Sequence, residues 1–469
     1  MRKSICRLVG FALLACLLLG SVASAESTYP IQTENSKLTF WLPIQPIASK
    51  YMASYNDHLI YKLISEKTGM DVEFINCAPA DGGTQLGLLI AGGDLPDIMQ
   101  IRGMYPGGAA AGVSEGVFLD LTPYLEEYAP DYYKAIRSSD LCYRLATSED
   151  GRVYAFLTLK QTAPAFNRLV ERQDVMDELG LTLPTTLADY EAHFAAMQTI
   201  DMAGILLDAN GRTPMLMWPF GITNDWCLNE EGKVVFGQYT ENYRDYLTTM
   251  NVWYEKGYIY KDFMSNMSDS EKQALLVNKL IGMLPIAVDL GNSLGVANGF
   301  DAAPLPYVRK EAVQSLHFET TYWDFVPEPS FGTTVIAADS KNIEAALQYM
   351  NYYYTKEGAD LCNWGIKDVH YTEDSSGTKT FTDEVLKNPN MPLGDTQMNF
   401  KIHMTAKWSE ADVVCNPNVV SNETALAKRM LYSDDATVDN AQTLPPFPMA
   451  AKASEERTSM YERYRNLHR

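Results

Sequence analysis

The sequence lacks the motifs of metal, redox and nucleotide chemistry. Its six histidines are scattered and form no HExxH pair, and no two cysteines are spaced as CxxC. A zinc protease and a thiol redox site are therefore disfavoured. SEDG and EDSSG lack the alternating oxygen ligands of a calcium loop, and DGGTQLG and YPGGAAAG lack the lysine and hydroxyl residue of a phosphate loop. We expect neither a cofactor nor a metal ion.

Positive charge is also scarce. The chain has 38 Lys and Arg against 59 Asp and Glu, a formal net charge of -21. An acidic surface repels phosphate backbones and anionic headgroups, so nucleic acid and membrane surfaces are disfavoured partners. A neutral or cationic ligand is easier to accommodate.

Long apolar runs are confined to the N-terminus. Arg2, Lys3 and Arg7 precede the run LVGFALLACLLLG, which is followed by SVASA. This layout predicts a secretory signal peptide over residues 1–25, cleaved after Ala25, because the run is short for a membrane span. A retained anchor is the alternative, and LLAC resembles a lipoprotein cleavage box, so lipidation of Cys16 stays open. The protein is expected outside the cell, free or at the extracellular face of the membrane.

Disulfides are not expected to hold the fold together. Removal of the leader leaves five widely spaced cysteines, an odd number: Cys77, Cys142, Cys227, Cys362 and Cys415. A chain of 469 residues exceeds what one core usually organises, and 46% of its residues are hydrophobic. We predict two packed domains.

The first hundred residues of the mature chain alternate strand and helix. KLTFWLP (37–43) and DVEFIN (71–76) are predicted strands, and apolar spacing predicts helices around Tyr55–Leu63 and Leu86–Ile90. In AGGDLPDIM (91–99), a glycine is expected to cap the second helix, Pro96 to prevent its continuation, and Asp97 to lead into a third strand. This order predicts a parallel α/β sheet.

Later segments continue the pattern. DGRVYAFLTL (150–159) is read as a turn and strand, Thr186 and Asp189 as a capping box, and Glu231–Gly232 as a hairpin turn. A helix is expected over 241–255, and apolar strands over 279–288 and 333–340.

In this order the segments resemble extracellular solute-binding proteins of ABC importers, in the large sugar-type family that includes maltose-binding protein, and particularly its lipoprotein branch common in Firmicutes. The matching stretches are KLTFWLP, LLIAGGDLPDIM, FLDLTPYLEEYAPDYY, DGRVYAF, VERQDVMDELGLTLPTTLADYEAHF, FGITNDWCLNEEGKVVF, YEKGYIYKDF and ADLCNWGIKDVHYT. Three departures stand out: no clear lipobox, a chain ending at EERTSMYERYRNLHR, and Asp368 where glycine is common.

The resemblance implies a two-lobed periplasmic-binding-protein-like (type II) fold with a hinge between the lobes. The first lobe is expected to comprise residues 26–155 and 285–335, and the second residues 156–284 and 336–469, with crossings near 155, 285 and 335. Such proteins catalyse nothing: as monomers, they capture a solute, here an oligosaccharide or similar polyhydroxyl compound, and present it to a membrane permease.

A sugar site needs aromatic faces beside amides, carboxylates or arginines. The candidates are Gln45, Arg102, Tyr105, Trp218, Trp226, Trp323, Asp324 and Trp364. Trp41 and Trp253 are assigned to the core. Arg172 and Asp174 match the R-x-D that the family carries before its second-lobe helix, and two roles stay open for them: a structural ion pair and a ligand contact.

Three other functions were weighed. GNSLG (291–295) follows a predicted strand, so Ser293 is a candidate nucleophile of a secreted serine hydrolase, with His317, His370 or His403 as base. The segment after it is rich in turns, which disfavours this function. A glycosidase carboxylate pair cannot be identified among so many acids. A sensor or adhesion module on the same fold would bind solute without a permease.

Overall fold

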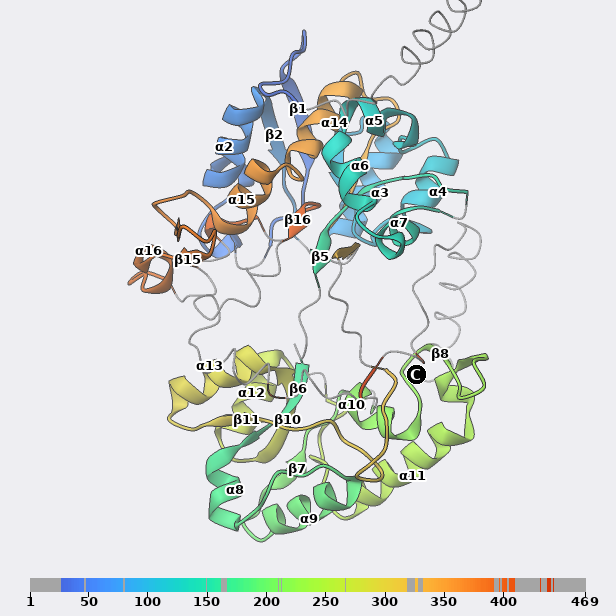
Figure 1. The fold of residues 1–469 in the computed structure, drawn as a ribbon, viewed down its shortest axis with the longest axis vertical. Helices are drawn as coiled ribbons and strands as arrows, with labels where there is room; N and C mark the ends of the chain where they lie inside the picture. The colour runs from blue at the N-terminus through green and yellow to red at the C-terminus, as the bar shows by residue number, and fades with distance from the viewer. Residues whose placement is uncertain are drawn as a thin grey trace, which may run out of the picture.

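The computed structural model describes residues 27–45, 48–78, 81–148, 150–161, 167–209, 211, 213–265, 267–318, 325–327, 332–391, 396, 399–402, 405–409, 431, 437–439 and 442. The predicted leader, with Cys16 and Ala25, and the candidates Trp323 and Asp324 lie outside these residues. The described residues form two lobes (Figure 1).

The first lobe is built on a five-stranded sheet in the order β2-β1-β3-β13-β4. β1 runs parallel to β2 and β3, as predicted, whereas β13 is antiparallel to β3 and β4. The sheet is therefore mixed. Its strands are β1 Lys37–Trp41, β2 Asp71–Ile75, β3 Ile98–Gln100, β4 Phe156–Leu157 and β13 Thr333–Ile336.

Helices surround this sheet, except α16, which packs against the small sheet of the lobe. They are η1 Ala48–Lys50, η2 Tyr55–Asp57, α2 Leu59–Thr68, α3 Gly82–Gly92, α4 Gly108–Ser114, η4 Thr122–Tyr124, α5 Leu125–Tyr128, α6 Pro130–Ile136, α7 Asp140–Ala146, α14 Ile343–Tyr352, α15 Lys356–Trp364 and α16 Asp383–Leu386. Two small sheets complete the lobe: β12 Phe325–Pro327, β5 Leu159–Gln161 and β16 Trp408–Ser409 form one, and β14 Tyr371–Glu373 and β15 Lys379–Phe381 form the other.

The turn in AGGDLPDIM forms as predicted. Gly93 caps α3 in the left-handed region, with φ 72°. Asp97 then ties three parts of the lobe together: its carboxylate accepts the Thr39 N–H and hydroxyl of β1, both at 2.9 Å, the Ser340 hydroxyl at 2.6 Å and the Asn342 amide at 3.1 Å. The turn therefore positions β3 beside β1 and beside the start of α14.

The second lobe contains a four-stranded sheet in the order β11-β6-β10-β7. Its strands are β6 Asn167–Arg172, β7 Ala203–Ile205, β10 Ile281–Ala287 and β11 Ala302–Pro304, with a hairpin of β8 Trp226–Leu228 and β9 Val234–Phe236 beside them. Its helices are α8 Gln173–Leu179, α9 Leu187–Gln198, α10 Pro214–Met217, η5 Trp218–Phe220, η6 Gly237–Tyr239, α11 Glu241–Glu255, α12 Asp269–Val277 and α13 Val288–Asn298. The capping box of Thr186 and Asp189 is present at α9.

The predicted lobe boundaries after residue 284 are wrong. β10 and β11 pair with β6 in the second sheet, so residues 285–304 do not return to the first lobe. Conversely, α14 and the Cys362 side chain of α15 pack in the core of the first lobe. The described C-terminal residues then rejoin the second lobe, where Leu316 bridges Val438 and the Leu228 N–H donates to Gln442 O. An apolar strand satisfies either sheet, so its sequence did not specify its partner.

Each lobe has its own aromatic core. Trp41 is buried in the first and Trp253 in the second, as predicted. Of the two roles left open for Arg172 and Asp174, the structure shows the ion pair, at 2.9 Å, and Arg172 also donates to the Val277 carbonyl at 2.7 Å. Asp368, where the resemblance led us to expect glycine, has φ 63°, the left-handed conformation that glycine adopts freely.

A buried histidine and carboxylate brace the second lobe. Nδ1 of His193 on α9 lies 3.2 Å from Oε1 of Glu171 on β6, and Nε2 lies 2.7 Å from Thr182 O. Burial lowers the pKa of His193, but the hydrogen bond and charge of Glu171 outweigh it, so the pKa is raised overall. Burial raises the pKa of Glu171. Both folded groups hold protons more tightly than their unfolded counterparts.

Stability is therefore expected to fall as the pH rises. The His193 contribution is complete below the ordinary imidazole pKa of about 6.5 and is lost as the pH passes the raised folded value. The Glu171 contribution changes in the same direction. We expect the free energy of unfolding, measured with urea across the neutral range, to decrease with pH in the wild type and to vary less in Glu171→Gln. Equal slopes in the two proteins would contradict this coupling.

Candidate functional site

The carboxyl ends of the parallel strands in both lobes point toward the space between them (Figure 1). β1 and β3 run toward the second lobe and end near Gln45 and Arg102. In the second lobe β6 begins just after the crossing, β10 is antiparallel to it and β7 is parallel to β10, so β7 and β10 end facing the first lobe. Open α/β sheets bind ligands at this edge. We call the two facing edges the interlobe edges.

Gln45 and Arg102 both lie near Tyr55 on the interlobe edge of the first lobe. The Gln45 N–H donates to the Tyr55 hydroxyl at 3.0 Å. Burial raises the pKa of Tyr55, and the nearby Arg102 charge opposes the rise. The Gln45 side-chain nitrogen is buried and has no hydrogen-bond partner among the described residues. An amide donor, a phenol and a guanidinium thus come together.

The backbone of Arg102 is strained. Its φ is 44°, a region that non-glycine residues rarely occupy. Such strain costs on the order of 1–3 kcal/mol and clusters at functional sites. The Arg102 N–H points toward Thr333 O, at 3.4 Å, at the start of β13. The conformation therefore holds this arginine where β3 leaves the sheet.

Tyr105 is as buried as Tyr55, and its ring and its hydroxyl are both engaged within the first lobe. It is buried, lies 4.8 Å from the Phe118 ring and donates its hydroxyl to the Glu115 carboxylate. Burial, followed by the hydrogen bond and charge of Glu115, raises the pKa of Tyr105 to about 12. We expect Tyr105 to support the Arg102 loop.

On the interlobe edge of the second lobe, Arg168, Tyr307 and Trp218 form a stack. The Arg168 guanidinium carbon lies 3.8 Å above the Tyr307 ring, and Arg168 donates to the Tyr307 hydroxyl. The Trp218 ring centroid is 6.2 Å from that of Tyr307, at an interplanar angle of 35°. Arg168 and Tyr307 are buried, whereas Trp218 is half-buried. An aromatic face is thus held rigidly beside a guanidinium.

The other predicted residues divide between surface and core. Trp226 is exposed on the β8 hairpin. Trp364 is a correction: it is fully buried and packs with Tyr371 and Phe381 in a separate small core, because it falls on the inner face of α15.

Three residues of this arrangement were missed. Tyr55 was read as part of a helical apolar stripe, and Arg168 and Tyr307 were not singled out. An arginine near the start of the strand that directly follows the first crossing was the available indication for Arg168. No local pattern distinguishes Tyr55 or Tyr307, because their partners come from other elements: Gln45 from the loop after β1, and Arg168 from β6.

Ser293 does not lie on a nucleophile elbow. GNSLG forms the interior of α13, which begins at Val288, rather than a sharp turn between strand and helix. Two of the candidate bases are engaged elsewhere: His317 pairs with Asp439 at 2.7 Å, and His370 Nδ1 accepts the Ile366 N–H at 3.0 Å. His403 lies outside the described residues.

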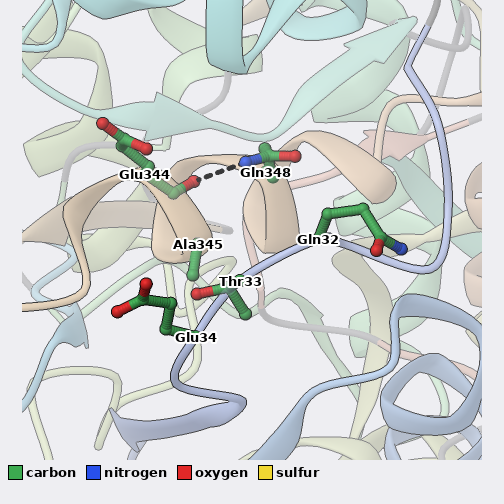
Figure 2. A pocket seen from close by; sticks show the side chains of 6 residues that line it. All are labelled: Gln32, Thr33, Glu34, Glu344, Ala345 and Gln348. Carbon is green, nitrogen blue, oxygen red and sulfur yellow. Dashed lines mark hydrogen bonds between the residues drawn. The ribbon is translucent and has the colours of Figure 1, made fainter.

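A pocket of about 450 Å³ lies between the segment before β1 and α14 (Figure 2). Gln32, Thr33, Glu34, Glu344, Ala345 and Gln348 line it. It is at the amino-terminal edge of β1, opposite the interlobe edge, and two of its lining residues are carboxylates. We assign it no role.

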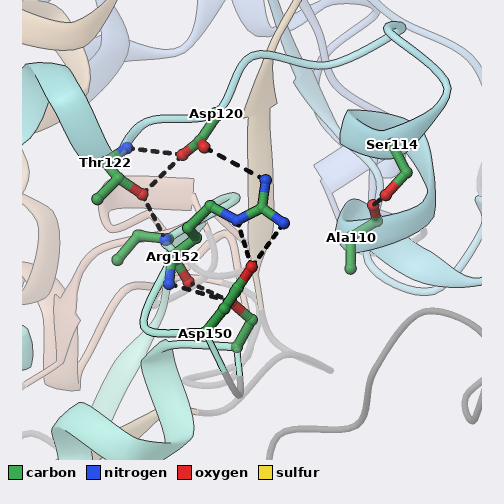
Figure 3. A network of polar contacts seen from close by, with 8 residues as sticks. Ala110, Ser114, Asp120, Thr122, Asp150 and Arg152 are labelled. Atoms are coloured by element: carbon green, nitrogen blue, oxygen red, sulfur yellow. Dashed lines mark hydrogen bonds and ion pairs between the residues drawn. The ribbon is translucent and has the colours of Figure 1, made fainter.

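A polar network at the start of β4 is structural (Figure 3). Arg152 donates to Asp150 at 2.6 Å and pairs with Asp120 at 3.7 Å, while Asp120 accepts the Thr122 hydroxyl at 2.6 Å. Hydrogen bonds from Arg152 and then Ser148 lower the pKa of Asp150 to about 2. The network joins the turn DGRVY to FLDLTP.

Within the described ranges, no three His, Cys, Asp or Glu side chains come together as a metal site would require. No helix in the part of the chain that the structure describes is both long and apolar enough to cross a bilayer.

A family model described as bacterial extracellular solute-binding protein matches residues 49–360. Among curated relatives, lipoprotein LipO of Bacillus subtilis is 24% identical over 339 residues, covering 66% of this chain and 63% of LipO. The polygalacturonan/rhamnogalacturonan-binding protein YtcQ of the same species is 23% identical, covering 68% and 64%. The match thus spans somewhat less than two thirds of the length of either relative.

Solved structures share the fold. The alginate-binding protein AlgQ2, without calcium, superposes with a TM-score of 0.71 at 18% identity, covering 92% of this chain and 90% of that one. The substrate-binding protein FusA of Streptococcus pneumoniae, in complex with kestose, gives 0.69 at 19% identity, covering 89% and 87%.

Proposed function

Because this chain belongs to the bacterial extracellular solute-binding proteins, we propose that it captures an oligosaccharide or similar polyhydroxyl solute between its lobes and delivers it to an ABC permease. The solute is held between the interlobe edges, and its differential affinity for open and closed forms drives closure of the lobes.

One observation carries the proposal: each interlobe edge presents an arginine beside an aromatic ring. In the first lobe Arg102 lies near Tyr55, and in the second Arg168 stacks on Tyr307 next to Trp218. A guanidinium donates to two neighbouring oxygens at once, and an aromatic face packs against the apolar face of a sugar ring. The unpaired Gln45 amide adds a donor on the same side as Arg102.

The relatives support the choice of solute. YtcQ binds polygalacturonan and rhamnogalacturonan, AlgQ2 binds alginate, and FusA was solved with kestose. These are saccharides of several units. The proposed role breaks no bond, which agrees with the placement of GNSLG within a helix.

The variant Arg102→Gly tests the proposal, because it is expected to lower the affinity for solute without lowering the stability of the fold. In Arg102→Gly the strained backbone is relaxed, so the melting temperature without solute is expected to equal or exceed that of the wild type. Loss of a hydrogen bond from a charged donor costs about 1.5–3 kcal/mol, so affinity should fall about tenfold or more. A thermal-shift screen of the wild type against a glycan library identifies the solute, and calorimetry then compares the variant.

Asp201→Gly is the matched control. Asp201 has φ 56°, is exposed and follows α9 away from the interlobe edges. Its replacement should relieve the same backbone cost and leave the affinity unchanged. If no carbohydrate shifts the wild-type melting temperature, the sugar assignment is overturned. A sensor or adhesion module would bind the same glycan, but the cell would import it without this protein.

A further inference from the structure

The β8 hairpin carries an exposed aromatic row next to the interlobe edge of the second lobe. Trp226, Phe236 and Tyr239 follow one another, with ring centroids 5.2 and 5.4 Å apart. Trp226 is 39% exposed and Tyr239 is 79% exposed. Large aromatic side chains usually bury most of their surface, so one such ring on the hairpin and another on η6, directly after it, need an explanation.

The row is rigid at its base. A Cβ on Gly237 would lie 2.5 Å from Thr223 O, so the chain after β9 passes directly against the segment before β8. The Gln238 amide donates to Asn224 O at 2.6 Å, and the Leu228 N–H donates to Gln442 O at 2.8 Å. Rings mounted on a fixed backbone lose little freedom when they bind a partner.

The row continues the interlobe edge. The chain runs from η5, which contains Trp218, through five residues, 221–225, to β8, and Figure 1 shows β8 at the side of the second lobe that faces the first. Polar groups accompany the rings: the Asp225 carboxylate accepts the Trp226 N–H at 2.8 Å, and Gln238 lies between Phe236 and Tyr239. Apolar ring faces beside amides and carboxylates suit pyranose or furanose rings better than a purely apolar partner.

We propose that Trp226, Phe236 and Tyr239 form an outer subsite that binds the protruding end of a long oligosaccharide whose other end lies between the lobes. This inference rests on the proposed function and extends it: the protein prefers long chains to short ones. Each stacked ring contributes about 0.5–1.5 kcal/mol, so losing one lowers the affinity for long chains about two- to tenfold.

Trp226→Ala and Tyr239→Ala test the subsite. The probes are size-separated series, from the disaccharide upward, of oligogalacturonides, of fructans such as kestose and nystose, and of any further glycan found in the screen. Both variants should bind the long members two- to tenfold more weakly and the disaccharide or trisaccharide as the wild type does. Tyr254→Ala is the matched control, because Tyr254 is 45% exposed on α11 of the same lobe, outside the aromatic row.

Three outcomes would overturn the outer subsite, and they can be told apart. Unchanged affinity for long members, or an equal loss for long and short ones, overturns the outer subsite while leaving the proposed function intact. A change in oligomeric mass on sedimentation, with unchanged glycan affinity, would assign the row to a protein interface and overturn the subsite as well. Absence of all glycan binding by the wild type overturns the proposed function and the subsite with it.

Discussion

Gly358→Ala is expected to destabilise the first lobe severely. Gly358 lies in the first turn of α15, and a Cβ there would sit 1.8 Å from the main-chain oxygen of Tyr352. This oxygen belongs to the backbone at the end of α14, and α15 begins only four residues later, at Lys356. The Thr355 hydroxyl also donates to it at 2.8 Å, which fixes its position. Relief requires the two helices to separate.

The expected cost is about 3 kcal/mol or more, at the upper end of the range for overpacking. That is a large fraction of the roughly 5–15 kcal/mol that stabilises a typical domain. Urea denaturation followed by circular dichroism measures it. The matched control is Gly87→Ala in α3, where nothing lies within 4 Å of the added Cβ and the residue is exposed.

Gly87→Ala should stabilise the protein by about 0.5–1 kcal/mol, because alanine loses less backbone freedom in a helix. The same substitution thus has opposite signs at two helical sites of one lobe. A Gly358→Ala variant as stable as the wild type would show that the junction between α14 and α15 is looser than described here.

Asp97→Ala is expected to have the second large effect. The substitution removes the acceptor for four hydrogen bonds that join β1 to the start of α14, and it leaves the half-buried Thr39 N–H without a partner. A hydrogen bond to a charged group is worth about 1.5–3 kcal/mol, and the four are not additive. We expect a loss of about 3–4 kcal/mol.

Asp97→Asn refines the test. The asparagine amide keeps one acceptor oxygen, but its NH₂ group faces donors that the second carboxylate oxygen accepted. The free energy of unfolding of Asp97→Asn should therefore lie between that of the wild type and that of Asp97→Ala. Asp94→Ala is the matched control, because Asp94 is an exposed carboxylate three residues earlier in the same turn. If Asp94→Ala costs as much as Asp97→Ala, the bonding of Asp97 is not the cause.

Asp97 also connects stability to binding. β3 ends at Gln100 and leads directly to Arg102. Asp97 fixes the register of β3 against β1, and this register also fixes how far Arg102 extends beyond the sheet at the interlobe edge. A destabilised Asp97→Asn variant that still folds is therefore expected to bind glycan more weakly as well.

Local sequence patterns were enough to predict most of the strands and helices. The alternation in KLTFWLP and DVEFIN, the glycine and proline of AGGDLPDIM, and the capping box at Thr186 specify strands and helices through contacts within a few residues of chain. The assignment of Trp41 and Trp253 to cores follows from the same periodicity. These features were correct because neighbours in the sequence decide them.

The sequence by itself determined the order of strands and helices, the turn at Asp97 and the resemblance to solute-binding proteins. Only the tertiary structure decided that β10 pairs within the second lobe, that α14 and α15 return to the first, and that Tyr55, Arg168 and Tyr307 share the interlobe edges with the predicted Gln45, Arg102 and Trp218. The physical reason is that strand pairing and side-chain contacts join segments that lie from ten to more than a hundred residues apart. An apolar strand or a lone tyrosine carries no local mark of which distant segment it will meet.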